Sequence, residues 1–330
     1  MDVLELERII QKILHPAGIV IDGPNPWDIR IRNGQFFKRV LRDGSVGLGE
    51  SFMDGWWECD RLDEFFCRLM PLRPEEVVRK NIKLRFGTLK ALVTNRASSS
   101  RAFAVGERHY DLGNQLFRRM LDRHMMYSCG YWKDAPNLDE AQEAKMDLAC
   151  RKLGLCPGDR LLDIGCGWGG FARYAAKRYG VRVVGITVSK QQAALARESC
   201  AGLPVEIRYQ DYRELNEVFD NIVSIGMFEH VCYKNYRIYM EVVHRCLRSG
   251  GLFLLHTIGN NDSRICVDPW FGKYIFPNSM IPSMKQISES AEKLFVIEDL
   301  HNLGPYYDPT LMAWFTNFDT HWHELREQCH

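Results

Sequence analysis

The sequence predicts an α/β protein whose main domain is built on a parallel β-sheet, preceded by a smaller, mostly helical N-terminal domain. From residue 160 onward, short apolar segments alternate with segments of helical length and pattern. A glycine-rich stretch at 163–170, DIGCGWGG, lies where the first apolar segment would turn into a helix. The 46% hydrophobic and 26% charged residues are typical of a globular chain with a sizeable core.

The apolar segments predict five strands, at 160–165, 181–186, 205–209, 220–225 and 252–257. The intervening segments predict helices at 171–179, 189–200 and 235–247. Ser189 is suited to cap the second of these helices, and Gly250 with Gly251 to end the third. Alternation at this spacing implies a parallel sheet that helices cover on both faces. Ligands of such sheets bind beyond the carboxyl ends of the strands.

The first hundred residues predict a separate accessory domain. Residues 4–14 form an amphipathic pattern, and 79–101 contain seven basic residues and no acidic one. We therefore divide the chain into an accessory domain at 1–95, for lipid binding or dimerisation, a linker at 96–105 and a catalytic domain at 106–330. The basic stretch fits a helix on an anionic membrane surface, and it fits equally an interdomain helix whose charges face water.

Composition excludes several classes of protein. A formal charge of +1 offers no overall attraction to nucleic acid. The eleven cysteines are scattered without framework spacing, and no secretory signal opens the chain, so we expect reduced thiols in a cytoplasm. No apolar run approaches the roughly 20 residues that span a bilayer. We also expect no metal site, because the histidines and cysteines near the end lack a spaced partner set.

The glycine loop fits two ligand classes. The spacing GxGxxG is that of dinucleotide sites, which bring a pyrophosphate to a helix N-terminus, whereas GxGxG is that of methyltransferases. A methyltransferase also has an acid two positions before the first glycine, and Asp163 stands there. Its carboxylate is suited to receive the ammonium group of S-adenosylmethionine, although a role as a turn cap is equally open. The glycines predicted to line this cofactor are Gly165, Gly167 and Gly169.

The ends of the next two strands carry the other cofactor candidates. Both ligand classes often place a carboxylate after the second strand to hold the ribose, but this sequence has none there. Thr187 and Gln192 are the polar residues able to take that place, and a helix-capping role for Thr187 is the alternative. Asp211, followed by Tyr212, is placed to accept from an adenine amino group or simply to form a turn.

Six motifs resemble those of a known enzyme family. They are YSCGYW at 127–132, LDIGCGWGG at 162–170, QDYRELN at 210–216, GMFEHV at 226–231, LLHTIG at 254–259 and KYIFPN at 273–278. Together with the segment 36–66, they make the chain resemble the cyclopropane-fatty-acyl-phospholipid synthase family. The resemblance implies a Rossmann-like class I methyltransferase sheet. It also implies methylene transfer from S-adenosylmethionine to the cis double bond of an acyl chain in a membrane phospholipid.

This chemistry sets requirements for the site. The alkene is a weak nucleophile that must be held dry and in line with the sulfonium methyl, and the carbocation that forms is stabilised by aromatic faces. The aromatic candidates, of which we expect most to be core, are Tyr127, Tyr131, Trp132, Phe228 and Tyr307. The resemblance implies that a bound bicarbonate removes the proton. It implies as its ligands Cys129, Glu229, His256, Ile258 and Tyr307, and it adds Tyr127 and Ser128 to the cofactor site.

Alternatives to these roles stay open. Cys129 with a histidine and a glutamate is compatible with thiol catalysis, or with an inert buried thiol. His256, in an apolar strand, is equally an ordinary core histidine. The resemblance places the protein peripherally on the inner face of the membrane, and a homodimer is compatible with it. Family members usually continue past residue 330. A related fatty-acyl C-methyltransferase is one alternative function. The shorter C-terminus favours a second alternative, a non-catalytic shortened homologue.

Overall fold

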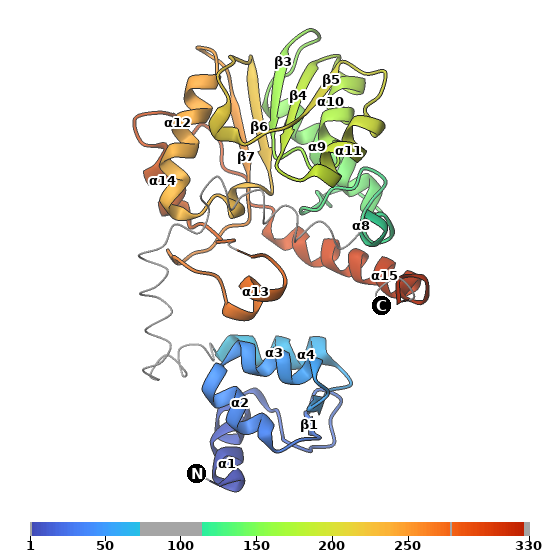
Figure 1. The fold of residues 1–330 in the computed structure, drawn as a ribbon, viewed down its shortest axis with the longest axis vertical. Coiled ribbons are helices and arrows are strands. Elements are labelled where there is room, and N and C mark those ends of the chain that lie inside the picture. Colours follow the sequence, from blue (N-terminus) through green and yellow to red (C-terminus); the bar gives the residue numbers. More distant parts are fainter. Residues whose placement is uncertain (1, 73–113, 278, 327–330) are drawn as a thin grey trace. The chain divides into compact units, whose positions relative to one another are not determined.

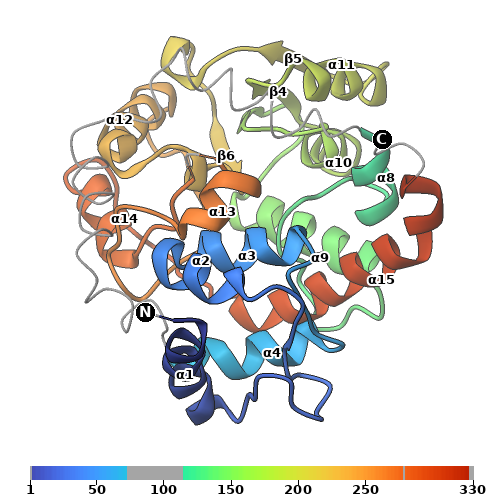
Figure 2. The same cartoon turned by 60° about the horizontal axis from the view of Figure 1, so that its bottom comes forward.

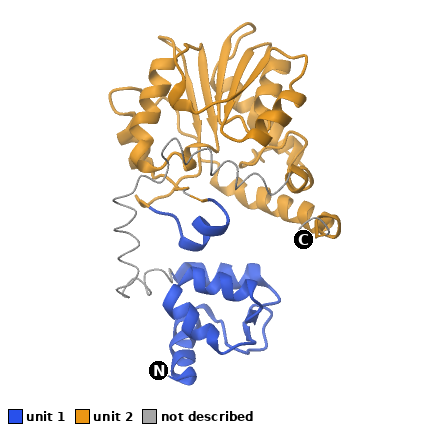
Figure 3. Ribbon diagram, in the orientation of Figure 1, with its two compact units in different colours: residues 1–94, 266–276 blue, residues 95–265, 277–330 orange. Residues whose placement is uncertain are grey.

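The computed structural model describes residues 2–72, 114–277 and 279–326, and it separates into two compact units. Residues 1–94 with 266–276 form unit 1, and residues 95–265 with 277–330 form unit 2 (Figure 3). The predicted linker at 96–105 and the basic stretch at 79–101 lie outside the described residues. The segment 266–276, which we had assigned to the catalytic domain, packs instead with the N-terminal residues.

Unit 1 is mostly helical, as predicted. Its helices are α1 (Val3–Leu14), α2 (Gln35–Asp43), α3 (Ser45–Met53), α4 (Leu62–Leu69) and α13 (Pro269–Tyr274) (Figure 1). A two-stranded antiparallel ribbon joins β1 (Arg30–Ile31) to β2 (Trp57–Glu58). The core gathers around Trp57, whose ring lies 5.4 Å from Phe65 and 6.1 Å from Phe36. Burial of these large aromatic rings explains how a short N-terminal stretch forms a core of its own.

Helix α13 belongs to unit 1 because of specific contacts with α3. A side chain at Gly49 would come within 2.1 Å of Trp270 Nε1, so the indole packs directly on the backbone of α3. Glu50 accepts hydrogen bonds from the Lys273 ammonium and, at 2.8 Å, from the Tyr274 hydroxyl. Lys273 and Arg39 lower the pKa of Glu50 to about 2, so this carboxylate stays ionised. Charge and packing therefore hold a distant part of the sequence in this unit.

Unit 2 contains a five-stranded sheet in the order β5-β4-β3-β6-β7, in which every pair is parallel. The strands are β3 (Arg160–Ile164), β4 (Arg182–Thr187), β5 (Val205–Tyr209), β6 (Asn221–Ile225) and β7 (Phe253–His256). All five predicted strands are thus confirmed, and so is the α/β class. The chain reverses its direction of winding between β3 and β6, which is the switch point where ligands of such sheets bind.

Helices cover both faces of this sheet (Figures 1 and 2). One face packs on α9 (Leu138–Lys152), α10 (Gly170–Tyr179) and α11 (Lys190–Ser199), and the other on α12 (Tyr236–Cys246) and α14 (Met284–Ala291). The alternation within β3 shows the two faces, since Leu161 belongs to the first core and Leu162 to the second. Helix α15 (Tyr307–Arg326) runs alongside α8 (Asn114–Met120).

Local signals explain the helix ends. Ser189 caps α11, because its Oγ accepts from the backbone N–H of Gln192 at 3.3 Å. Helix α12 ends at Cys246, where Leu247 turns to extended backbone. Gly250 and Gly251, which we expected to end that helix, form the following turn, with Gly250 at a φ of 75°. None of the described helices is long and apolar enough to cross a bilayer.

Candidate active site

The glycine loop joins β3 to α10 at the switch point of the sheet. Gly165, Gly167 and Gly169 all have positive φ angles, of 83°, 55° and 81°, which other residues adopt only with strain. A side chain at Gly165 would meet Met227 at 2.6 Å, whereas one at Gly167 would meet nothing within 4 Å. The loop therefore packs closely against the end of β6 and leaves its backbone open at Gly167.

Asp163 lies in β3 just before this loop, and its side chain is almost fully buried. No described residue gives its Oδ2 atom a hydrogen bond. Burial raises the pKa of Asp163 to about 7, and no cation offsets that effect. A carboxyl group that caps a turn accepts hydrogen bonds from nearby backbone N–H groups, which Asp163 Oδ2 does not do within the described part of the chain. A buried, unpaired carboxyl group is instead suited to bind a cationic ligand.

Polar residues follow β4 and β5 as well. Thr187 donates to Gln192 Oε1 at 2.9 Å and accepts from the N–H of Ser189 at 3.2 Å. Asp211 Oδ1 accepts from both the backbone and the side chain of Arg213 at 2.9 Å, which makes it a turn residue as the alternative held. Its Oδ2 atom is nevertheless buried without a partner among the described residues. Both functions of Asp211, turn and acceptor, are therefore compatible.

Tyr212 lies beside Asp211 and is also buried. Its ring packs at 5.1 Å against Tyr239, and its hydroxyl has no hydrogen-bond partner among the described residues. Burial raises the pKa of Tyr212 to about 12, so the hydroxyl remains protonated. Its ring contributes to the core around β3, β4 and β6.

The segment 124–130 crosses the same edge of the sheet. A side chain at Gly170, the first residue of α10, would meet the His124 carbonyl at 2.1 Å, and one at Gly226 would lie 3.7 Å from Ser128 Cβ. Tyr127 packs between Phe117 and Trp314, with ring distances of 5.3 and 5.1 Å. The segment thus places Tyr127, Ser128 and Cys129 next to the ends of β3 and β6.

Cys129 is 2% exposed, and its Sγ lies 3.6 Å from the carbonyl oxygen of Leu303. Burial raises the pKa of this thiol, so it stays protonated at neutral pH. Nucleophilic cysteines have the opposite environment, with a lowered pKa and some exposure. The structure therefore favours the inert thiol over thiol catalysis.

Glu229 connects the ends of β6 and β7. Its Oε1 accepts a 2.7 Å hydrogen bond from the backbone N–H of Ile258, and its Oε2 is buried with no partner among the described residues. Burial raises the pKa of this carboxyl group. Glu229 thus bonds the backbone of Ile258, and no hydrogen bond joins it to His256 among the described residues. The N–H of Ile258 is accordingly occupied and is not free to hold an anion.

His256 and Tyr307 are the remaining two of the five residues that the resemblance implies as bicarbonate ligands. His256 ends β7, where burial together with the charge of Lys145 lowers its pKa to about 3 and keeps its ring neutral. Tyr307 begins α15, where burial raises its pKa and the charge of Glu229 acts in the same direction. Cys129 lies near the start of the same helix, because its Sγ is 3.6 Å from the Leu303 carbonyl oxygen and the next residue, Gly130, donates to Thr310 Oγ1 at 3.0 Å.

The other aromatic candidates have mixed surroundings. Phe228 is fully buried and stacks on Tyr236 at 4.1 Å, so it belongs to the core. Tyr131 packs edge-on to Tyr306 at 5.4 Å. Trp132 donates from its indole to Thr310 Oγ1 at 2.9 Å, which ties the segment to α15. Most of the aromatic candidates are thus packing residues, as expected.

Sequence reasoning missed two buried polar residues on α9, Gln142 and Lys145. Gln142 donates to the Ser128 carbonyl at 2.7 Å, and Lys145 donates to the Ser128 hydroxyl at 2.8 Å. Both lie on the helix face that also buries Met146 and Cys150. The signal that could have found them is a lysine at the helical spacing of an apolar face.

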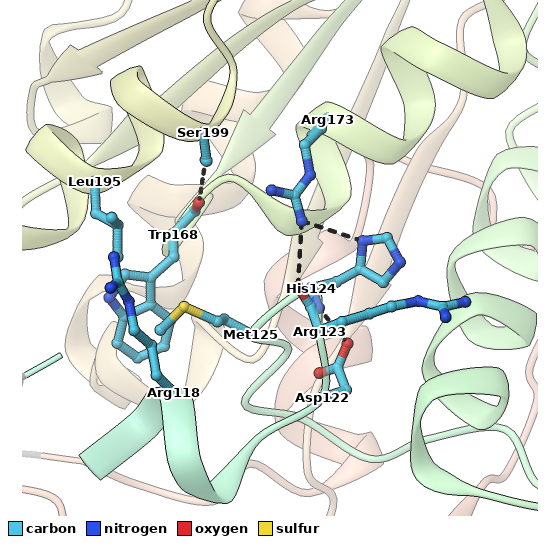
Figure 4. Close-up of a pocket in the computed structure, with 9 residues that line it drawn as sticks. All are labelled: Arg118, Asp122, Arg123, His124, Met125, Trp168, Arg173, Leu195 and Ser199. Atoms are coloured by element: carbon cyan, nitrogen blue, oxygen red, sulfur yellow. Dashed lines mark hydrogen bonds between the residues drawn. The ribbon is translucent and has the colours of Figure 1, made fainter. Parts of the chain in front are cut away.

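A separate hollow of about 260 Å³ opens beside the glycine loop (Figure 4). It is lined by Arg118, Asp122, Arg123, His124, Met125, Trp168, Arg173, Leu195 and Ser199. Figure 4 shows Arg173 reaching toward His124, and its Nη2 lies 3.4 Å from the Arg123 carbonyl. None of the predicted site residues lines this hollow. Among the described residues, no three histidine, cysteine or acidic side chains are grouped to hold a metal.

The sheet order, the glycine loop and the acid before it define the class of protein, an S-adenosylmethionine-dependent methyltransferase. The model of the mycolic acid cyclopropane synthetase family matches residues 97–330, and the chain belongs to this family. It is 55% identical over 320 residues to the cyclopropane-fatty-acyl-phospholipid synthase of Escherichia coli (strain K12), covering 97% of this chain and 84% of that protein.

Two solved structures share this fold. The cyclopropane synthase MmaA2 from Mycobacterium tuberculosis is 34% identical, with a TM-score of 0.65, and the match covers 69% of this chain and 86% of that one. The mycolic acid cyclopropane synthase CmaA1, complexed with SAH and CTAB, is 35% identical with a TM-score of 0.63, covering 68% and 85%. The predicted family is thus confirmed.

Proposed function

We propose that this protein is a cyclopropane fatty acid synthase. It transfers a methylene group from S-adenosylmethionine to the cis double bond of an unsaturated phospholipid acyl chain. The observation that carries the proposal is the 55% sequence identity with the Escherichia coli synthase, in a match that covers 97% of this chain. The CmaA1 complex supports it, because SAH is the demethylated cofactor and CTAB carries a long alkyl chain.

The cofactor has a complementary set of groups in unit 2. Asp163 receives the ammonium group with its unpaired Oδ2, and Gly167 lets the ligand approach the backbone. Gln192, oriented by Thr187, faces the ribose, and the unpaired Oδ2 of Asp211 accepts from the adenine amino group. The remaining residues that we assign to the cofactor site are Tyr127, Ser128, Gly165, Gly169 and Tyr212.

The reaction starts when the alkene attacks the methyl group of the sulfonium. The new C–C bond leaves a carbocation, and S-adenosylhomocysteine departs. Aromatic faces stabilise such a cation by about 0.5–2 kcal/mol each. Tyr307 is suited to this role, since it is half-buried beside Glu229 and its hydroxyl stays protonated. Loss of a proton from the transferred methyl group then closes the ring.

Bicarbonate fits the group around Glu229. The unpaired Oε2 of Glu229 would accept a hydrogen bond from this anion, and neutral His256 and protonated Tyr307 would donate hydrogen bonds to it. Cys129 closes the site from the segment 124–130. When bound, bicarbonate supplies the base that takes the proton. Ile258 contributes by positioning Glu229 through its N–H.

The substrate also implies contact with a membrane. We place the protein peripherally at the cytoplasmic inner face, with unit 1 serving lipid binding or dimerisation. Removing the charges of Lys83, Arg85 and Lys90 together tests whether the basic stretch makes this contact, since each contributes about 1 kcal/mol near an anionic surface. Weaker flotation with anionic vesicles at low salt supports it, and unchanged flotation rejects that stretch as the contact.

The decisive experiment uses vesicles of an unsaturated phospholipid and S-adenosylmethionine labelled in its methyl group. We expect label in the lipid, a mass gain of one CH₂ and loss of the double bond without a methyl branch, shown by hydrogenolysis and mass spectrometry. A branched product instead identifies the fatty-acyl C-methyltransferase. Cofactor binding with no labelled lipid identifies a non-catalytic homologue.

A further inference from the structure

Lys145 is a buried lysine on α9 that forms no ion pair with a carboxylate among the described residues, although the charge of Asp122 acts to raise its pKa. It is 3% exposed, and its ammonium group donates to Ser128 Oγ at 2.8 Å and to Gln142 Oε1. An ammonium group has three N–H donors, so one has no acceptor among the residues that the structure describes. Buried charges are costly unless an opposite charge compensates them, and Asp122 acts in that direction without outweighing the effect of burial on the pKa of Lys145. The ammonium group therefore has an N–H to offer to a ligand.

The bond to Ser128 has a fixed direction. Because an ammonium group only donates, the Ser128 oxygen accepts, and its own hydrogen points to a different acceptor. Gln142 binds the backbone carbonyl of the same residue, donating to it at 2.7 Å. Two side chains one helical turn apart on α9 thus fix both the backbone and the hydroxyl of Ser128. Ser128 itself lies beside Gly226, at the carboxyl end of β6.

Asp163 and Lys145 are buried groups of opposite charge at this edge of the sheet, and no ion pair joins them among the described residues. Asp163 has an unpaired carboxylate oxygen, and Lys145 donates to Ser128 and Gln142 instead. The amino-acid part of S-adenosylmethionine is a zwitterion, with one ammonium and one carboxylate. A separated anion and cation therefore match such a ligand, whereas paired charges would neutralise each other.

We propose that Lys145 is a positioning residue that fixes the Ser128 hydroxyl as a donor to the carboxylate of the cofactor and supplies the positive charge behind it. The proposal rests on the proposed function for the identity of the cofactor. Burial lowers the pKa of Lys145 to about 8, so its charged form predominates at neutral pH. The titratable groups that face it are Asp122, Cys129 and His256.

The test measures binding by calorimetry with the full chain. The ligands are S-adenosylhomocysteine, which carries the carboxylate, and 5′-methylthioadenosine, which lacks the whole amino-acid part. In Lys145→Met we expect affinity for S-adenosylhomocysteine to fall about tenfold to hundredfold, as for loss of a charged hydrogen bond, with affinity for methylthioadenosine unchanged. Lys152→Met is the matched control, because Lys152 lies on the same helix and pairs with Asp299.

Two further variants make the outcome unambiguous. Ser128→Ala should lose a similar factor, and the double variant Lys145→Met/Ser128→Ala should lose little more than either single one, because the two residues act as a unit. Lys145→Gln keeps a donor to Ser128 without the charge, and should also weaken S-adenosylhomocysteine alone. It provides the test if the methionine variant fails to fold.

Three outcomes would overturn the proposal. They are an equal loss of affinity for both ligands, no loss for either, or fully additive effects in the double variant. Failure of the proposed function is recognised separately. It appears as wild-type protein that does not bind S-adenosylhomocysteine at all, or that binds it and leaves lipid unmodified.

Discussion

Glu229 and Ile258 are joined by a 2.7 Å hydrogen bond from the backbone N–H of Ile258 to one carboxylate oxygen of Glu229. Glu229 follows β6 and Ile258 follows β7, so this bond ties together the ends of two neighbouring strands. The second oxygen of Glu229 is left buried and unpaired at the same edge. One side chain thus combines a structural bond with a free acceptor.

The different surroundings of the two carboxylate oxygens predict the behaviour of Glu229→Gln. The amide oxygen can still accept from Ile258, so the fold and the cofactor site should persist, while the free acceptor is lost. We expect turnover to fall by about 10²–10⁴-fold, with affinity for S-adenosylhomocysteine within about threefold of wild type. Single-turnover kinetics and calorimetry measure the two quantities. An equal loss of both would remove the assigned role.

Asp163 predicts a pH-dependent stability. Its pKa is raised by burial from 3.8 to about 7, so the folded state binds this proton more tightly than the unfolded chain does. The free energy of unfolding of the unliganded protein should therefore fall as pH rises from about 4 to 7, by up to about 4 kcal/mol. Urea denaturation of wild type and Asp163→Asn checks this, since the variant should lack that component. Parallel pH profiles for the two proteins would contradict it.

Cys129 predicts tolerance to substitution. Its thiol is protonated and buried, so Cys129→Ala should keep turnover within about tenfold of wild type, whereas loss of a true nucleophile costs on the order of 10⁶-fold. The steady-state rate with phospholipid vesicles measures this. Iodoacetamide serves as a control, because the exposed Cys67, Cys156 and Cys266 should react before Cys129. A variant without detectable turnover would restore thiol catalysis.

Thr310 predicts a local stability effect. Its hydroxyl accepts from Gly130 N–H at 3.0 Å and from the Trp132 indole, and donates to the Tyr306 carbonyl at 2.7 Å. Thr310→Val removes all three bonds in a buried place and should cost about 1–3 kcal/mol of unfolding free energy. Thr310→Ser keeps the hydroxyl and is the control. Urea denaturation that finds both variants equal to wild type would exclude this role of Thr310.

The sheet was predictable because its signals are local. Each strand of unit 2 is a short apolar run, and the turn into α10 needs glycines that the sequence displays. Asp163 was predictable for the same reason, since it stands two positions before Gly165, at the end of a strand. The cap at Ser189 likewise depends on residues within one helical turn.

Other features depend on contacts that sequence patterns do not encode. The packing of Trp270 on Gly49 joins positions far apart in the chain, so 266–276 could not be assigned to unit 1 beforehand. The occupied N–H of Ile258 depends on where Glu229 turns after β6. Lys145 was visible as a charge on an apolar helix face, but its partner Ser128 became known only from the fold.

The contacts of α13 with α3 have a consequence for how the gene can be divided. A fragment that stops at residue 94 would lack Trp270, so the backbone around Gly49 would lose its cover. Glu50 would also lose Lys273 and Tyr274, two of the three groups that hold it ionised. The N-terminal unit is therefore completed by a piece of polypeptide encoded far downstream. Recombination that exchanges only the first part of the gene between relatives would have to preserve this match or replace both parts together.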